Sequence, residues 1–471
     1  MTYSILLIAL PLLMAFLSIL IKRPKHHFLY LGLVLNLGIL LVLDKGYYLI
    51  GGYDKGLGIS LVLDQYGYLA VWIVNGLFVL GVLANRHKIE AYATIILTLL
   101  AGVNGMVLTG DLFNLFVFIE VTSISVFILT TSSKKLLATF NYIIIATLGS
   151  SLYLIGIMIL YSQFGTLDIQ LMGQMARSSD LNLFIPMIFI FLGLGVEVKL
   201  IPLNGWVKGI YARANGLVLT LMGASVASAG LLVMGRILNE VLIGQTGVIS
   251  LVVTLACLTL VGGEIAAFNG KTIKEVLLYS SIGQAGLICL LMAFGLVFPA
   301  LVLVINNGLA KLVLFSVGDI IQKDNQAYRN QRGWFSNHQG LGLAFTVASL
   351  SLVGLPLFMG FYGKINGLVG LFNEGLGWVV LIALVTIIEG AYMIKLNICL
   401  WHPGQEGQEV TQFPVDSSRV SKGTLVTSLA ISLVILVLGV FPSWLGQVIS
   451  VEDLDYETET QYLIDLKGGN E

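Results

Sequence analysis

Residues 111–130 read DLFNLFVFIEVTSISVFILT. After Asp111, this stretch carries a single charge, Glu120, with apolar sequence on both sides. A membrane-spanning helix needs about 20 mostly apolar residues, and a charge inside one is costly enough to suggest a function. The stretch therefore predicts a transmembrane helix that holds a functional carboxylate.

The composition of the whole chain agrees with this prediction. Of its 471 residues, 57% are hydrophobic and 11% are charged, whereas soluble proteins average about 45–50% apolar and about 25% charged residues. This composition excludes a soluble fold and predicts an all-α, multi-pass membrane protein. A transmembrane barrel would instead show short segments of alternating hydrophobicity. The net charge of −1 gives no sign of a nucleic-acid partner.

Apolar runs between charged breaks predict about 14 transmembrane helices in one polytopic domain covering residues 1–471. The expected spans are 2–21, 28–43, 62–84, 91–109, 112–131, 140–162, 181–203, 215–235, 246–268, 276–295, 297–321, 341–361, 376–401 and 424–447. An acidic tail follows at 448–471.

The charges of the loops indicate how the chain is oriented. An even number of spans puts both termini on one side, and loops on the other side are much richer in Lys and Arg. Because basic loops stay cytoplasmic, both termini are expected on the outer side of the cell membrane. The basic loops carry Lys22, Arg23, Lys25, Arg86, Lys88, Lys134, Lys135, Lys208, Arg213, Lys271, Lys274, Lys323, Arg329, Arg332, Arg419 and Lys422. The opposite side carries Lys45, Lys55, Arg177, Arg236, Lys364 and Lys467.

Two of the predicted spans, the seventh and the twelfth, contain residues that interrupt helices. The expected helix breaks are at Gly195 and Pro202 and at Gly354 and Pro356. A pair of interrupted helices, each beside a lysine, is typical of transporters built from inverted repeats. We therefore expect two inverted five-helix repeats, at 91–235 and 246–401, with the broken helix fourth in each.

Charged residues inside the spans are the candidate functional groups. Glu120 and Lys199 each have apolar sequence on both sides. A desolvated lysine gives up its proton readily, and a nearby carboxylate restores it. The two residues are therefore predicted to load and release a proton, with a static ion pair between helices as the alternative. Asp319, Glu389 and Lys395 lie nearer span ends and are expected to reach the membrane interface.

Several segments, taken in order over about residues 60–400, resemble the antiporter-like subunit family. This family comprises subunits of Mrp-type multisubunit Na+/H+ antiporters, of complex I and of related membrane-bound hydrogenases and sulfur reductases. Its fifth helix resembles the stretch around Glu120, and its seventh-helix lysine is matched by Lys199 in VKLIPLNGW. Its eleventh-helix lysine is matched by Lys311 in GLAKLVLFSVGD, and its twelfth-helix lysine by Lys364 in GLPLFMGFYGK. The stretch KEVLLYSSIGQAG and the arginine of AGLLVMGR, Arg236, also fit.

The resemblance implies a subunit that carries H+, or supports Na+/H+ exchange, along a hydrated row of charges inside a larger complex. It implies that Glu120 modulates Lys199, the central carrier. It implies that Lys311 is a relay and that Lys364 connects to the other half or to the next subunit. Among family members the Mrp D-type subunit is favoured, especially in hydrogenase-like or sulfur-reducing complexes. Partners would be other membrane subunits and the lipid bilayer, and redox chemistry would lie on those subunits.

The chain also departs from the family pattern. Asn204, Lys208, Tyr211 and Asn215 replace the usual histidine, proline, histidine and proline after the seventh-helix break. Ser228 stands where the family has a central eighth-helix lysine, and Asn307 replaces an eleventh-helix histidine. A hydroxyl can hold water but cannot store a proton charge. We expect Ser228 and Asn307 to line an ordered-water segment between Lys199 and Lys311. Two further candidate relay groups are Glu197 and Glu264.

These departures keep two other functions open. The first alternative is a degenerate structural subunit that packs between its neighbours without translocating ions. The second is an independent secondary transporter for an organic solute, with the broken helices forming its site. The cysteines, Cys257, Cys289 and Cys399, lie in apolar runs without metal-ligand spacing. We therefore expect no metal, no cofactor and no redox or hydrolytic site in this chain.

The topology can be tested by cysteine accessibility labelling. Cysteines introduced at Lys134 and at Glu457 should react from opposite sides of the membrane, because the first position lies in a basic loop and the second in the acidic tail. Labelling of both positions from the same side would contradict the predicted span count.

Overall fold

Helices make up nearly all of the regular structure of this chain. The computed structural model describes residues 3–21, 24–53, 55–56, 58–86, 89–131, 136–178, 181–241, 246–322, 326–402 and 421–449. Most of the predicted acidic tail at 448–471 therefore lies outside the described residues, as do several of the loop charges used for the topology. Those loop residues are Lys22, Arg23, Lys88, Lys134, Lys135, Lys323, Arg419 and Lys467.

Within the described ranges, ten helical segments are long and apolar enough to cross a membrane. They are α1 (Leu6–Leu20) with the short helix η1 (Tyr3–Ile5) before it, α3 (Gln65–Ala84), α5 (Leu112–Thr131), α6 (Leu136–Phe164), the continuous helix of α10 (Gly216–Thr220), η3 (Leu221–Val226) and α11 (Ala227–Val241), α12 (Thr246–Phe268), α13 (Ile273–Ala293), α14 (Val297–Ile321), α17 (Leu376–Trp401) and α18 (Lys422–Val440).

Four apolar helices are shorter, and each lies at another of the predicted spans. They are α2 (Lys25–Leu41), α4 (Ala93–Leu108), α8 (Phe184–Glu197) and α15 (Gln339–Val353). The remaining helical segments are α7 (Ile169–Arg177), α9 (Val207–Tyr211), η4 (Tyr328–Gln331), η5 (Trp334–Ser336), α16 (Met359–Phe372) and α19 (Pro442–Val448). The predicted class of fold, an all-α protein with many membrane-spanning helices, is thus confirmed.

One small sheet lies in a region that was predicted only as a loop. Strands β1 (Gly46–Leu49) and β2 (Ser60–Leu63) pair in antiparallel register. The Tyr47 hydroxyl and the Ser60 hydroxyl both donate to the carboxylate of Asp168, which caps the N-terminus of α7. The hairpin is therefore fixed to the segment that precedes α7.

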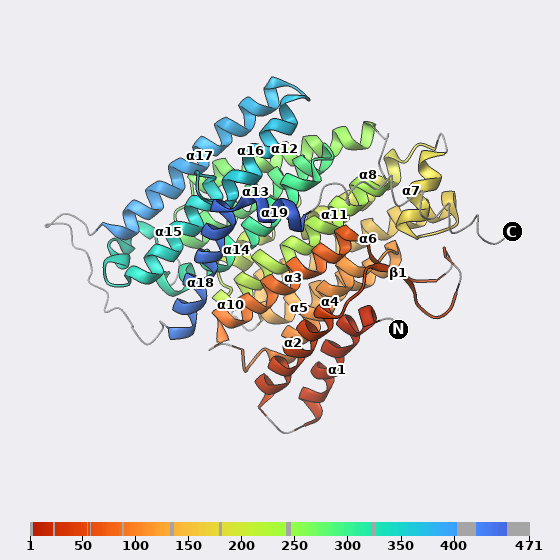
Figure 1. Cartoon of the computed structure of the whole chain (residues 1–471), viewed down its shortest axis with the longest axis horizontal. Coiled ribbons are helices and arrows are strands. Elements are labelled where there is room, and N and C mark those ends of the chain that lie inside the picture. Colours follow the sequence, from red (N-terminus) through yellow and green to blue (C-terminus); the bar gives the residue numbers. More distant parts are fainter. Residues whose placement is uncertain are drawn as a thin grey trace.

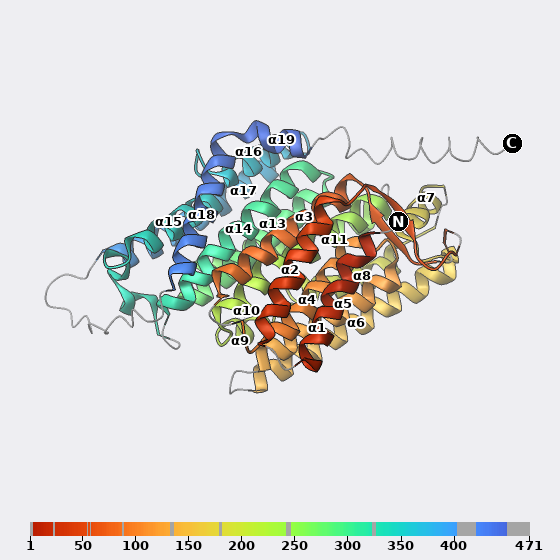
Figure 2. The same cartoon turned by 60° about the horizontal axis from the view of Figure 1, so that its bottom comes forward.

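The helices form a single bundle in which α14 joins the two parts of the chain. Figure 1 shows α1 and α2 at one edge and α17 at the opposite edge, with α3, α11 and α14 between them. Helix α14 packs against α13, α15, α16 and α18, and on its other side against η3 and α3. After a turn of 60°, most of the long helices run side by side (Figure 2).

Glycines allow a close contact between α12 and α13. A Cβ added to Gly263 would lie 2.4 Å from the backbone nitrogen of Gly283, and one added to Gly286 would lie 2.4 Å from that of Leu260. Small residues let two backbones approach in this way. The contact brings Glu264, next to Gly263 on α12, against α13.

Both interrupted helices end in the same hydrogen-bonded motif. In α8 the Leu200 amide donates to the Gly195 carbonyl (2.8 Å), and in α15 the Leu355 amide donates to the Leu350 carbonyl (3.2 Å). This six-residue closure needs a left-handed residue just after the helix, usually glycine. In α15 that residue is Gly354, at φ 82°, and in α8 it is Lys199, at φ 66°.

The interruptions extend beyond these motifs into turns. Pro202 lies in the turn between α8 and α9, and Pro356 lies between α15 and α16. Gly195 itself lies within the last turn of α8. The described residues place Lys199 at the end of a helix and Lys364 one turn into the helix that follows the second break.

The second break can be tested at Gly360 in α16. A Cβ there would lie 1.8 Å from the Ser351 carbonyl oxygen, so Gly360→Ala must displace backbone and should lower the free energy of unfolding by about 1–3 kcal/mol. Gly76→Ala is the control, because nothing lies within 4 Å of the added Cβ. The measurement is thermal unfolding of the detergent-solubilised protein, and equal melting temperatures for the two variants would contradict the packing described here.

Candidate functional site

Lys199 is buried at the break that ends α8. Only 3% of its surface is exposed. Its Nζ donates to the Tyr211 hydroxyl at 2.7 Å and lies over the ring of the same tyrosine. Among the described residues no carboxylate forms an ion pair with it. A left-handed non-glycine residue costs about 1–2 kcal/mol, so the local backbone is strained at the residue predicted to carry the proton.

The carboxylate nearest to Lys199 along the chain is Glu197, and Glu120 does not pair with this lysine directly. Glu197 is the last residue of α8 and accepts a hydrogen bond from the Ser123 hydroxyl at 2.7 Å. Ser123 lies on α5, one turn after Glu120. Both carboxylates interact electrostatically with each other, and Glu197 also does so with Lys199. Glu197 is therefore within electrostatic range of both Glu120 and Lys199.

Lys311 is completely buried in the middle of α14. Its Nζ donates to the Leu277 carbonyl at 3.1 Å and to the Ser280 hydroxyl at 2.9 Å, both on α13. Within the described part of the chain it has no ion pair. Lys199 lies within electrostatic range of it.

Lys364 differs from the other two lysines because it has a direct anionic partner. Its Nζ lies 2.5 Å from Glu389 Oε2 on α17 and donates to the Val353 carbonyl at 3.1 Å. Glu389 also accepts from Gln284 Nε2 at 2.7 Å. The expectation that Glu389 reaches the membrane interface is wrong, since only 2% of it is exposed. Its lysine partner is 25 positions away, so residue spacing could not identify the pair.

Other predicted residues lie in the same region. Glu264, 1% exposed, accepts a hydrogen bond from the Tyr392 hydroxyl at 2.7 Å. Asp319, also expected at the interface, pairs with Lys274 at 2.8 Å and accepts from the backbone of Gly216. It thus fixes the start of α10. Lys395 is exposed and lies over the ring of Phe268.

The two residues predicted to line a water segment each carry a buried polar atom without a partner among the described residues. These are Ser228 Oγ on α11 and Asn307 Oδ1 on α14, neither of which has a hydrogen bond to any described residue. The two helices pack against each other. A buried polar atom normally has a protein or water partner, so the positions suit the predicted water segment, which stays a prediction.

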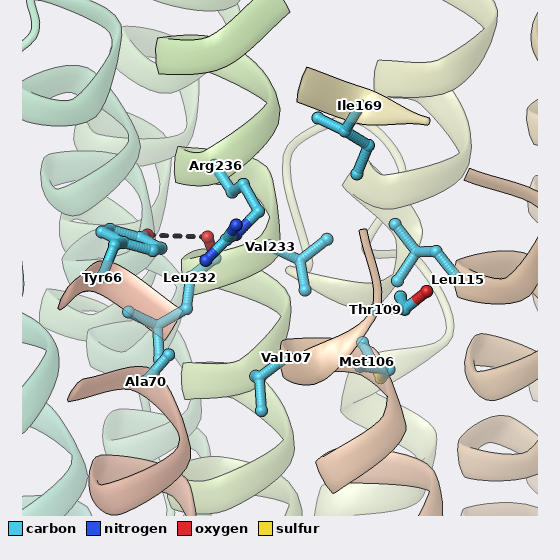
Figure 3. A pocket seen from close by; sticks show the side chains of 10 residues that line it. All are labelled: Tyr66, Ala70, Met106, Val107, Thr109, Leu115, Ile169, Leu232, Val233 and Arg236. Carbon is cyan, nitrogen blue, oxygen red and sulfur yellow. Dashed lines mark hydrogen bonds between the residues drawn. The ribbon is translucent and has the colours of Figure 1, made fainter. Parts of the chain in front are cut away.

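A second charged cluster lies at the far end of α11. Arg236 was expected in a loop, but it is 4% exposed and lies within the helix. It binds Asp64 at 2.7 Å and Glu240 at 3.1 Å. Figure 3 shows a small pocket beside it, with the Tyr66 hydroxyl bonded to the Leu232 carbonyl at 2.7 Å. Because Asp64 also caps α3, this cluster clamps α3 to α11.

Sequence reasoning gave no site role to Tyr211, Ser280, Gln284 and Tyr392, and it assigned Glu389 to the membrane interface. Tyr211 and Ser280 do stand in segments that resemble the family, but neither carries a charge, and charge inside a span was the signal for a functional residue. Tyr392 lies one turn after Glu389 on α17, so the helical spacing of two polar residues was the available signal. In the described residues no group of three or more His, Cys, Asp and Glu side chains could hold a metal ion.

Known proteins resemble this chain over most of its length. The family model described as "NADH:quinone oxidoreductase/Mrp antiporter, TM" matches residues 109–388, more than half of the chain. The chain is 27% identical to the D-type subunit of the Na(+)/H(+) antiporter of Bacillus subtilis over 80% of this chain and 78% of that protein. It is 28% identical to the N-type subunit of the NADH-quinone oxidoreductase of Desulforudis audaxviator over 75% of this chain and 74% of that protein.

Solved structures show the same fold. A chain of the membrane-bound sulfane sulfur reductase, an archaeal respiratory membrane complex, superimposes with a TM-score of 0.85 at 28% identity, covering 97% of this chain and 98% of that one. A chain of the Mrp complex from Dietzia superimposes with a TM-score of 0.87 at 21% identity, covering 98% of each. This multi-pass membrane protein therefore belongs to the NADH:quinone oxidoreductase/Mrp antiporter transmembrane family.

Proposed function

We propose that this chain is an ion-translocating subunit of a multisubunit membrane complex, either an Mrp-like antiporter or a respiratory complex. The observation that carries the proposal is the row of three buried lysines, Lys199, Lys311 and Lys364, inside an apolar bundle. Charged groups in such a position are expensive and mark ion pathways. The ion is H+, alone or in exchange for Na+, and the other subunits supply any redox chemistry.

The proposed topology follows from the same features. The four shorter helices complete 14 crossings, with both termini outside the cell membrane. Two inverted repeats, at 91–235 and 246–401, place α8 and α15 fourth in each five-helix unit. Their identical terminal motifs, at Lys199 and Gly354, support this symmetry.

In the proposed mechanism each lysine is loaded and unloaded by what its neighbours do. Lys199 has a phenol but no anion in contact, so its ammonium form depends on Glu197 and, through Glu197, on Glu120. A shift of Glu197 away from Lys199 favours proton release, because an unpaired buried ammonium is poorly solvated. Once Lys199 has lost its positive charge, it no longer repels a charge on Lys311, and Lys311 can then take up a proton. Lys364, held by Glu389, ends the row.

One observation favours a second candidate, a structural subunit without its own translocation. Ser228, near the start of α11, stands where the family resemblance places a titratable lysine. If no water occupies this segment, Lys199 and Lys311 are disconnected and the chain is a spacer in its complex.

Replacement of Lys199 distinguishes the two candidates. Lys199→Ala should abolish ion translocation by the reconstituted complex while assembly is retained, because alanine cannot bind a proton. Lys199→Arg should also fail, because guanidinium does not release its proton. Lys395→Ala is the matched control, since this exposed lysine lies outside the row.

Lys199→Gly separates the role in transport from a role in folding. Glycine relieves the left-handed strain at this position, so the variant should be at least as stable as the wild type and still inactive. Full translocation by the Ala or Gly variant would refute the carrier role. Loss of assembly in both would favour the structural subunit.

A further inference from the structure

Glu264 is a buried carboxyl group that forms no direct ion pair with any described residue. It lies on α12, 1% exposed, where it contacts α13 through Gly283. Its Oε2 accepts the Tyr392 hydroxyl, and its Oε1 has no hydrogen-bond partner among the described residues. No cation forms an ion pair with it in the part of the chain that the structure describes.

The charged groups around Glu264 are already committed to other partners. They are Glu389 from α17, Lys364 from α16 and Lys311 from α14. Lys364 binds Glu389 and the Val353 carbonyl, and the second oxygen of Glu389 binds Gln284. Lys311 binds the Leu277 carbonyl and Ser280. Lys364 and Glu389 therefore already pair with each other, and Glu264 lies beside them as an additional carboxyl group.

A chain of hydroxyl groups connects this carboxyl to Lys311. Lys311 Nζ donates to Ser280 Oγ at 2.9 Å, Ser280 lies beside the Tyr392 hydroxyl, and that hydroxyl donates to Glu264 Oε2 at 2.7 Å. Each hydroxyl can accept one proton and donate another. The groups lie in the order that proton transfer between a lysine and a carboxyl requires.

We propose that Glu264 is a proton-storage site, neutral at rest, which exchanges its proton with Lys311 through Tyr392 and Ser280. The inference rests on the proposed function, because it presumes that Lys311 belongs to the translocation row. A buried carboxylate without a cation is strongly disfavoured against its neutral acid. When the Lys311 ammonium has passed a proton to the Glu264 carboxylate, both groups are uncharged. This lowers the free-energy cost of burying them.

The transfer is balanced in protons. Starting from the Lys311 ammonium and the Glu264 carboxylate, an N–H bond of Lys311 breaks as Ser280 accepts its proton. Ser280 passes its own proton to the Tyr392 oxygen, and Tyr392 passes its phenolic proton to Glu264, where a new O–H bond forms. Both hydroxyls are restored, Lys311 becomes the amine, and no oxidant or reductant is needed.

The unpaired oxygen atom of Glu264 suits a proton better than a metal cation. Hard metal cations in proteins take several oxygen ligands, whereas the unpartnered atom here is the single oxygen Oε1. Gly283 packs against that oxygen, since a Cβ added to this glycine would lie 2.2 Å from it. A proton needs only one oxygen and no additional space.

The test compares Glu264→Gln with Glu389→Gln in the intact, reconstituted complex. Glutamine imitates a neutral carboxylic acid, so Glu264→Gln should leave the melting temperature unchanged. Glu389→Gln should lower it, because it leaves the Lys364 ammonium buried and unpaired. Glu264→Gln should also remove one protonated-carboxyl C=O band from the infrared spectrum and lower translocation by about a hundredfold.

Tyr392→Phe provides a second, independent variant. Loss of its hydroxyl should shift the Glu264 infrared band and lower translocation by about a hundredfold. Tyr153→Phe is the matched control, because this buried tyrosine donates only to the Leu112 carbonyl and its replacement should leave the band and the rate unchanged.

Several results would overturn the inference while leaving the carrier role of Lys199 intact. One is a fall in melting temperature for Glu264→Gln as large as that for Glu389→Gln, which would mean that Glu264 is ionised. A second is stabilisation by Na+ that Glu264→Gln abolishes, which would mean a sodium site. A third is wild-type translocation by Glu264→Gln or Tyr392→Phe.

Discussion

A charged group inside an apolar bundle is stable only when protein atoms or water replace the solvation that it has lost. Each of the three lysines in this chain meets that constraint differently. Lys199 has a phenol, Lys311 has a carbonyl and a hydroxyl, and Lys364 has a carboxylate. Only Lys364 is neutralised directly. The charge on Lys199 and on Lys311 depends on groups that lie further away. A change in those groups can therefore release a proton from either lysine or let it bind one.

The interrupted helices make these arrangements possible. A continuous helix would use the backbone carbonyls near Lys199 and Lys364 for its own hydrogen bonds, whereas the break after α15 frees the Val353 carbonyl for Lys364. At the first break the lysine itself occupies the left-handed position that glycine occupies at the second. Strain of this kind persists only where the surrounding structure enforces it, and here it fixes the direction in which the carrier side chain leaves the backbone.

Much of this organisation could be predicted from the sequence because it is local. Apolar runs predicted the helices, and Gly354 and Pro356 predicted the second break. Lys199 was found as a charge inside a span, and Lys311 and Lys364 through the family resemblance. Partners could not be predicted in the same way, because each pair joins residues on different elements. Glu389 meets Lys364 only when α17 packs on α16, and Tyr211 meets Lys199 only after the chain turns back. Glu197 was predicted only as a possible relay group, and its hydrogen bond to Ser123 on α5 could not be predicted from the sequence.

The central claim is that the two halves are connected by water at the segment where the family lysine is missing. The most direct measurement is a density map of the assembled complex at a resolution that shows ordered water. The account predicts water bound to Ser228 Oγ and Asn307 Oδ1, in a continuous polar path from Lys199 to Lys311. Apolar side chains packed between these two atoms, with no water, would contradict it and would make the chain a spacer rather than a carrier.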